Sequence, residues 1–176
     1  VTCGSNLPES ANQQVAFQKR HNGQWVTVGG TGLHGGKFSK NLKIRKGGKF
    51  RVWTKRVGTN PDLKVLLLHG GPGATDELYE CFDVWFPGAG IEYYFYDQLG
   101  SFRSDQPDDP ALWDLGRFVD EVEQVRQALG LGADNFVLLG QSWGGLLAME
   151  YAVHHQQHLM GLVISNMMSS SRLYNA

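Results

Sequence analysis

Short, continuously apolar runs alternate with amphipathic stretches through most of the chain. The runs at residues 65–68, 136–139 and 162–165 are typical of strands that are covered on both faces. Residues 91–96 predict one more strand. Helical patterns separate these strands, so the order from residue 63 onward is strand, helix, strand, helix, strand, helix, strand. This alternation predicts an α/β fold, with a mostly parallel sheet and helices on its faces.

Two stretches between the strands have the spacing of helices that bury one side. Residues 77–86 predict a helix whose buried side carries Leu78, Cys81, Phe82 and Trp85. A second helix is expected to begin after a capping Asp114 and to end at Gly130. Its expected buried stripe comprises Leu115, Phe118, Val119, Val122, Val125 and Leu129.

The first part of the chain has a different pattern. Residues 1–13 are polar and aperiodic and are expected to form an extended leader. Alternation at 15–20 and 25–28 predicts short strands, and a hairpin is expected around a turn at 46–49. Residues 15–38 loosely resemble the immunoglobulin-like units of secreted bacterial proteins. The alternative is an irregular extension that pairs with the edge of the main sheet.

Charge divides the chain in the same way. Of the 16 basic and 17 acidic residues, residues 1–60 hold eleven basic and one acidic, so the parts before and after residue 60 carry about +10 and −11. We therefore expect a basic, glycine-rich β extension at 1–46 and a separate unit at 47–176. Lysines on hairpin edges are usually solvated, so no nucleic-acid partner is expected.

Cysteine usage and hydropathy add little about location. Cys3 and Cys81 make no disulfide framework and lack metal-ligand spacing, and Cys81 is expected in the core. No apolar run is long enough to predict a membrane span. The chain starts at Val1, so a leader could have been removed, and both a cytoplasmic and an exported location stay open. Cys3 would suit a lipid-anchored start, although Thr2 before it fits poorly.

The pentapeptide Gly140-Gln-Ser-Trp-Gly144 lies between the apolar run at 136–139 and a helical pattern at 146–153. A strand that turns sharply into a helix crowds its own backbone, and glycines two residues before and after Ser142 relieve that crowding. The serine hydroxyl is then exposed at a helix N-terminus, which favours developing negative charge. The pattern predicts a nucleophile elbow.

Two more loops follow strands that the pattern predicts to be parallel. They are His69-Gly-Gly-Pro-Gly73 and Asp97-Gln-Leu-Gly-Ser101. The C-terminal edge of such a sheet is where ligands bind. Gly70 and Gly71 would let backbone N–H groups approach an oxygen, and with the N–H of Trp143 they could form an oxyanion hole.

Together, His69-Gly-Gly-Pro-Gly73, Asp97-Gln-x-Gly100 with Ser104-Asp-Gln-Pro107, and Gly140-Gln-Ser-Trp-Gly-Gly145 resemble the proline iminopeptidases of the α/β-hydrolase superfamily. The similarity runs from about Gly47 to the end of the chain. It implies an α/β-hydrolase-type sheet that is incomplete at its C-terminal side, where the cap and the last part of the domain are absent. Leu99 departs from the pattern, since the family often has arginine there.

The resemblance implies a serine aminopeptidase that releases proline, or another small residue, from the N-terminus of a peptide. Ser142 is the implied nucleophile, and Gly71 and Trp143 supply the oxyanion N–H groups. The loop residues Gly70, Gly73, Asp97 and Gln98 are expected to contact substrate. No metal or cofactor is implied.

The acid and the histidine of the triad follow the serine in this superfamily, and the resemblance places both beyond Ala176. His154, His155 and His158 are interpreted as surface residues, because side chains on the helix after the elbow cannot reach back to Ser142. Asp97 and Asp105 are expected to shape loops rather than to act as the triad acid. Without a base the serine is a poor nucleophile, so the 176-residue chain alone is expected to be nearly inactive.

Two alternatives stay open. One is an amino-acid amidase or esterase on the same scaffold. The other is a non-catalytic binding protein that uses residues 1–46 and carries a degenerate hydrolase half. An epoxide hydrolase or dehalogenase is disfavoured, because those enzymes have aspartate where Ser142 stands. The oligomeric state is left open, although the strand at 162–165, without a further neighbour, predicts poor solubility or dimerisation.

Overall fold

The computed structural model describes residues 14–21, 24–32, 37–44 and 48–167, with side chains described from Phe50 onward. The chain divides into two compact units, Val1–Phe38 and Ser39–Ala176. This division lies before the boundary at residues 46 and 47 that the sequence predicts, because strand β3 (Lys37–Ile44) joins the sheet of the second unit. The expected leader and the Cys3 anchor lie outside the described residues.

The first unit contains one antiparallel pair of strands. β1 (Gln14–His21) pairs with β2 (Gln24–Gly32), and the register shifts between Phe17 and Gln18. The two short strands that alternation predicts here are therefore present. The immunoglobulin-like and edge-pairing interpretations of this segment stay predictions.

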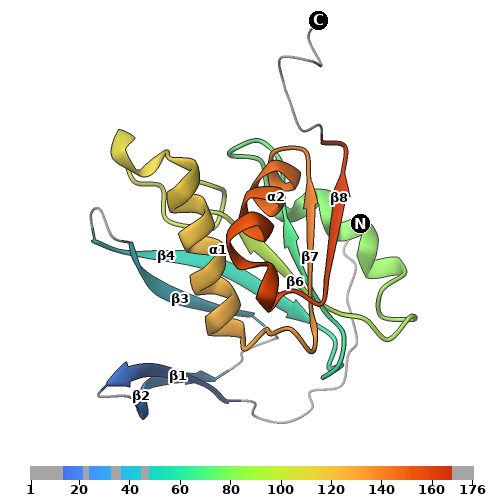
Figure 1. The fold of residues 1–176 in the computed structure, drawn as a ribbon, viewed down its shortest axis with the longest axis horizontal. Coiled ribbons are helices and arrows are strands. Elements are labelled where there is room, and N and C mark those ends of the chain that lie inside the picture. The colour runs from blue at the N-terminus through green and yellow to red at the C-terminus, as the bar shows by residue number, and fades with distance from the viewer. Residues whose placement is uncertain (1–13, 22–23, 33–36, 45–47, 168–176) are drawn as a thin grey trace, which may run out of the picture. The chain divides into compact units, whose positions relative to one another are not determined.

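The second unit is built on a six-stranded sheet with the order β3-β4-β6-β5-β7-β8 (Figure 1). Strands β6, β5, β7 and β8 are parallel, whereas β4 is antiparallel to β6. The further strands are β4 (Gly48–Val57), β5 (Lys64–Leu68), β6 (Glu92–Asp97), β7 (Phe136–Gln141) and β8 (Gly161–Ser165). The predicted mostly parallel sheet is confirmed.

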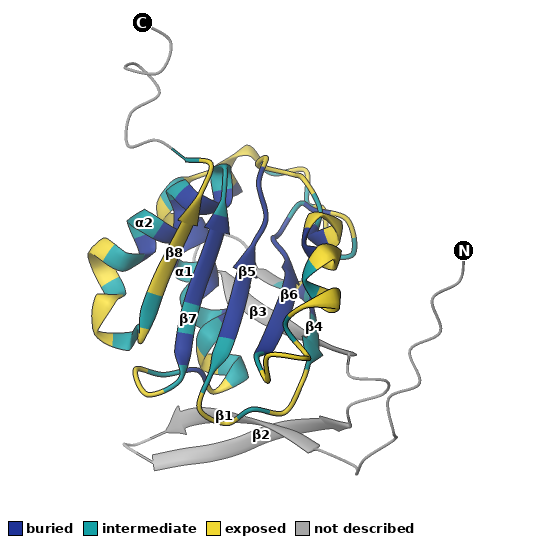
Figure 2. Ribbon diagram, turned by 90° about the vertical axis from the view of Figure 1, so that its right-hand side faces the viewer, coloured by how far each residue is buried: buried dark blue, intermediate teal, exposed yellow. Residues whose placement is uncertain are grey.

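The central strands are buried on both faces, and alternate residues serve different cores. Leu66 and Leu68 of β5 belong to one apolar cluster, while Val65 and Leu67 belong to another. This follows from the two-residue period of a strand. Figure 2 shows β5, β6 and β7 largely in the colour of buried residues and β8 largely in that of exposed residues.

Helices α1 (Leu115–Leu129) and α2 (Trp143–His155) cover one face of the sheet (Figure 1). The Asp114 side chain caps α1 by accepting a hydrogen bond from the Arg117 N–H, 3.0 Å away. Gly130 ends the helix in the left-handed conformation with φ 65°. The predicted stripe of α1 packs in this core, with Leu115 and Leu129 partly buried.

The prediction for the first helix is wrong in its type and in most of its buried side, where only Phe82 of the four expected residues packs against a core. Residues Asp76–Val84 form a 3₁₀ helix, η1. Leu78 within it and Trp85 directly after it are 55% and 72% exposed. A 3₁₀ helix has three residues per turn, so positions three apart lie above one another. Tyr79 and Phe82 therefore share the side that packs against the second core. Cys81, which we expected in the core, is exposed.

Strand β8 leaves apolar side chains uncovered. Leu162, Val163 and Ile164 are each 38–44% exposed, and within the described residues β8 has a neighbour only in β7. Two short 3₁₀ helices, η2 (Pro110–Leu112) and η3 (Gln156–His158), complete the described elements. In the part of the chain that the structure describes, no helix is both long and apolar enough to cross a membrane.

The exposed edge predicts self-association of the 176-residue chain. We expect Val163→Lys to lower the apparent mass in light scattering, because a charge on an edge strand opposes strand pairing between molecules. Val84→Lys is the matched control, since Val84 is 72% exposed on η1 and lies away from the sheet edge. A monodisperse monomer of the unaltered chain would contradict the prediction.

Candidate active site

The site is organised by the sharp turn between β7 and α2. Ser142 occupies this turn with φ 54° and ψ −123°, a conformation that is unusual for a residue other than glycine. Its N–H donates to the Ser165 carbonyl of β8, 3.0 Å away, and its own carbonyl accepts from the N–H of Gly145 at 2.8 Å. The predicted elbow geometry is present, with Ser142 immediately before the first turn of α2.

The two glycines of the elbow are required by close contact with other backbone. A Cβ on Gly140 would lie 2.1 Å from the Gly144 carbonyl oxygen. A Cβ on Gly144 would lie 1.9 Å from the Leu68 carbonyl oxygen. Gly144 therefore brings the start of α2 directly against the end of β5, where the second loop of the site begins.

That second loop lies beside the nucleophile. A Cβ on Gly70 would meet the Gln141 Oε1 at 2.9 Å and the Ser142 Cβ at 3.2 Å. Gly71 has φ 116°, which L side chains rarely adopt, and its Cβ would lie 2.6 Å from the Ala74 nitrogen. Gly73 also has a positive φ, 89°. Glycine at position 70 thus lets the loop backbone run close to the Ser142 side chain, whereas glycine at 71 and 73 permits the positive φ angles of the loop.

His69, at the start of this loop, is fully buried and has both ring nitrogens engaged. Its Nδ1 lies 2.9 Å from the Gly70 carbonyl oxygen, and its Nε2 accepts from the Gln98 N–H at 3.0 Å. Burial lowers the pKa of His69, so the ring is neutral at pH 7 and the Nδ1 carries the proton. Neither nitrogen is left to serve as a base for Ser142.

Gln98 links the three loops. Its side-chain amide donates to the His69 carbonyl at 2.9 Å, and its Oε1 accepts from the Trp143 indole N–H at 2.9 Å. The sequence predicts that the three strand ends meet at one edge, and these bonds join them. Gln98 is only 1% exposed, so its contacts in the described structure are with the protein.

Asp97 lies behind the same edge and is fully buried. Its carboxylate accepts from the backbone N–H groups of Asp76 and Arg103 at 3.2 and 3.3 Å. The Arg103 guanidinium pairs with both carboxylates, 2.7 Å from Asp76 and 3.4 Å from Asp97. Burial, with the charge of Asp76, raises the pKa of Asp97 to about 6. The group shapes the loop after β6.

Asp105 also shapes that loop, as expected. It accepts a hydrogen bond from the backbone N–H of Arg51 on β4 at 2.6 Å. Its own N–H donates to the Arg51 carbonyl at 2.9 Å. The loop after β6 is therefore tied to the neighbouring antiparallel strand.

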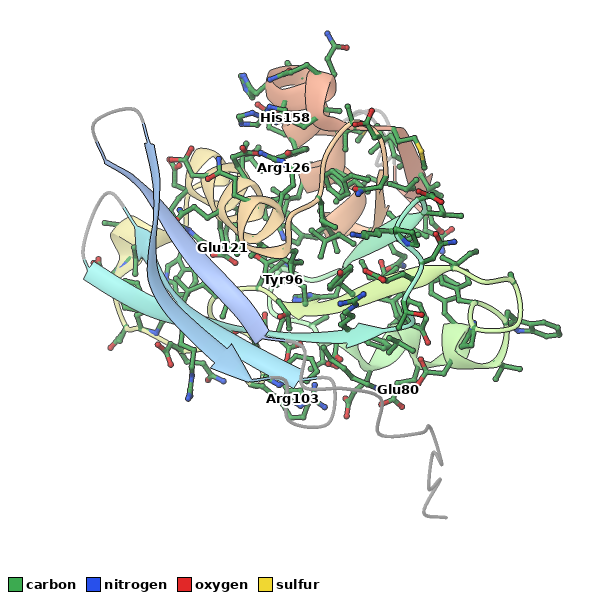
Figure 3. All side chains as sticks on the ribbon, turned by 90° about the horizontal axis from the view of Figure 1, so that it is seen from below. Glu80, Tyr96, Arg103, Glu121, Arg126 and His158 are labelled. Carbon is green, nitrogen blue, oxygen red and sulfur yellow. The ribbon has the colours of Figure 1, made fainter. Side chains whose placement is uncertain are left out.

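Sequence reasoning missed Glu121 of α1, whose side chain holds the backbone of the loop after β6. Its carboxylate accepts from the backbone N–H of Leu99 at 2.9 Å and also bonds Tyr96 and Arg117 (Figure 3). Glu121 is completely buried, and Leu99, at the position where the related pattern often has arginine, is 1% exposed. The available signal was a glutamate three residues after Phe118, on the buried side of α1.

Known proteins resemble this chain in the same region. Residues 64–174 match the family model described as alpha/beta hydrolase fold. The chain belongs to this family. This α/β hydrolase is 61% identical over 127 residues to the proline iminopeptidase of Flavobacterium johnsoniae, which covers 72% of the chain and 43% of the relative. It is 54% identical over 128 residues to that of Chitinophaga pinensis, covering 73% and 43%.

A solved structure gives the same result. The α/β hydrolase chain superposes on the crystal structure of a proline iminopeptidase from Mycobacterium smegmatis with a TM-score of 0.65 and 33% sequence identity. The match covers 78% of this chain and 46% of the other. The resemblance to proline iminopeptidases is confirmed, and the chain spans less than half the length of the relatives it matches.

The elbow contacts predict a steep cost for a single methyl group. Gly144→Ala should lower the free energy of unfolding by about 3 kcal/mol or prevent folding. The added methyl group would collide with the carbonyl oxygens of Leu68 and His69, which cannot move without disturbing the end of β5. Gly132→Ala is the control, since nothing lies within 4 Å of its Cβ, and it should change stability by less than about 1 kcal/mol. Urea denaturation compares them, and equal effects would refute the packing argument.

The raised pKa of Asp97 predicts a pH-dependent stability. Between pH 4 and 6 the folded state keeps the Asp97 proton while the unfolded chain releases it, so the folded state binds more protons and its stability falls as the pH rises. Asp97→Asn removes this loss. The stability of the variant relative to the unaltered protein should therefore increase from pH 4 to pH 6 in urea titrations, and a constant difference would contradict it.

Proposed function

We propose that the protein is a serine aminopeptidase of the proline iminopeptidase type, which releases N-terminal proline from peptides. The observation that carries the proposal is the placement of Ser142 at a positive φ, directly beside the glycine loop. The loop is so close that a Cβ added to Gly70 would lie only 3.2 Å from the Ser142 Cβ. The relatives named proline iminopeptidase support the substrate class. Because the chain spans under half of their length, the activity is proposed for the whole protein and not for these 176 residues alone.

In the proposed reaction the Ser142 hydroxyl attacks the carbonyl carbon of the N-terminal proline residue. The hydroxyl proton passes to the triad histidine, which the chain order of the superfamily places after the nucleophile. The N–H groups of Gly71 and Trp143 stabilise the negative oxygen of the tetrahedral intermediate. The intermediate expels the amine of the shortened peptide, which takes the proton from the histidine.

An acyl-enzyme on Ser142 then remains. Water attacks its ester carbonyl, gives one proton to the same histidine, and frees proline as Ser142 regains its hydrogen. Gly70 and Gly73 are proposed to shape the loop along which the substrate lies. Asp97 and Gln98 are proposed to act on substrate through the loops that they hold.

The histidines after the elbow are poor candidates for the base. α2 begins at Trp143, and His155 is its last residue. At a rise of 1.5 Å per residue, His155 lies about 18 Å along the helix axis from Trp143, the residue next to Ser142. His154 is exposed, and His155 and His158 are partly exposed, in keeping with their interpretation as surface residues.

The test compares the protein encoded by the complete gene with its Ser142→Ala variant on proline 4-nitroanilide. We expect the variant to lose at least about a thousandfold in kcat, since the nucleophile is removed. Ser165→Ala is the control, because Ser165 contacts Ser142 through its backbone carbonyl. The 176-residue chain alone should show almost no turnover.

Two further readouts separate the alternatives. Faster turnover of leucine amide or of an ester than of proline amide would favour the amidase or esterase. A fluorophosphonate probe should label Ser142 in the complete protein. Absence of labelling in a folded, complete protein would overturn the catalytic proposal and favour the binding protein.

A further inference from the structure

Three metal-ligand side chains meet at the end of α2 that is remote from Ser142. Glu123 comes from α1, His155 is the last residue of α2, and His158 belongs to η3. One ligand atom from each lies within 4.8 Å of those of the other two. All three residues are partly exposed, so an ion could reach them from solvent.

The backbone explains why the histidines converge. α2 ends at His155, and the single turn of η3 then brings His158 back beside it. The two imidazole rings stack with centroids 5.8 Å apart and planes inclined by 16°. A continuous α-helix would instead have placed His158 above His154, four residues earlier. His154 contacts Glu150 at 3.2 Å and is not part of the group.

Glu123 provides a carboxylate that its neighbours hold in place. Its oxygens accept hydrogen bonds from Arg126, Tyr151 and Gln127. The Arg126 guanidinium donates from Nε and Nη2 at 2.8 and 2.7 Å. Such bonds orient a carboxylate, as the outer partners of metal-binding carboxylates do. Figure 3 shows Arg126 and His158 close together where α1 meets α2.

The Nδ1 of His158 faces this carboxylate without a good hydrogen bond. It is shielded from solvent and lies 3.5 Å from the Glu123 Oε2, beyond ordinary hydrogen-bond length. A shielded nitrogen that lacks a close partner leaves free energy to be gained from a ligand.

We propose that Glu123, His155 and His158 bind a divalent transition-metal ion of the zinc class. Two imidazoles and one carboxylate are a ligand set that suits Zn²⁺, with water in the fourth position. Zn²⁺ holds such atoms at about 2.0–2.2 Å, so neighbouring ligand atoms lie about 3.4 Å apart in a tetrahedron. The ligand atoms, which lie within 4.8 Å of one another, must therefore close by at most about 1.4 Å, within the reach of rotations of partly exposed histidines.

One existing hydrogen bond must give way. The Glu123 oxygens already accept from Arg126 and Gln127, and the Tyr151 hydroxyl donates to Oε2 at 2.8 Å. Oε2 is also the oxygen that faces His158. The Tyr151 hydroxyl is the uncharged donor on that oxygen, so the ion takes its place. Removal of this hydroxyl should therefore strengthen binding.

The experiment measures Zn²⁺ binding to the untagged full chain by equilibrium dialysis, with Mg²⁺ as the control ion. We expect one equivalent of Zn²⁺, at least tenfold weaker binding for His158→Ala and His155→Ala, and unchanged binding for His154→Ala. Tyr151→Phe should bind about two- to fivefold more tightly. Zn²⁺ should raise the Tm of the unaltered protein and of the His154→Ala variant, but not that of His158→Ala.

Three results would overturn the proposal. The first is no Zn²⁺ bound at about 100 µM free ion. The second is equal weakening by His154→Ala and His158→Ala, which would mean adventitious chelation by two surface histidines. The third is unchanged affinity in Glu123→Gln that remains folded by circular dichroism, which would exclude the carboxylate as a ligand. None of these depends on the proposed peptidase activity, because Ser142 lies at the other end of α2.

Discussion

The contact between Gly144 and the Leu68 carbonyl determines how the site is assembled. A Cβ on Gly144 would lie 1.9 Å from that oxygen, so only glycine lets the first turn of α2 lie against the end of β5. This contact places the turn at Ser142 beside the loop that contains Gly70 and Gly71. Packing of one helix against one strand thus brings together the two loops that the proposed acyl transfer would use, one for its nucleophile and both for its oxyanion N–H groups.

The polar side chains behind this edge keep the arrangement in place. Gln98 bonds both His69 and Trp143, so the glycine loop and the elbow share one partner. Its amide is buried, and both its nitrogen and its oxygen have a hydrogen-bond partner. Glu121 holds the backbone at Leu99, directly after Gln98, and Asp97 holds it at Arg103, further along the same loop. These buried groups act on the geometry of the site through the loops.

Local patterns predicted the parts of the fold that depend on local rules. The apolar runs predicted β5 and β7, and Asp114 and Gly130 predicted both ends of α1. The buried side of η1 was predicted wrongly because its residues were assigned the period of an α-helix, 3.6 residues per turn, whereas a 3₁₀ helix has three. The bonds of Gln98 join residues 29 and 45 positions apart in sequence, so no local spacing could reveal them. The motifs showed which loops meet, but not which atoms bond.

Helix α2 connects two separate kinds of chemistry. Its first N–H groups face the elbow, whereas its last residue joins the group of Glu123 and His158 about 18 Å along the axis. An ion there would tie α2 to α1 without approaching the reacting atoms. Since α2 begins at the residue whose N–H is proposed to stabilise the oxyanion, added stability at its far end would restrict the helix as a whole. The two proposed sites thus have separate ligands and reacting atoms, but a metal ion at one end would act on the other through the helix that they share.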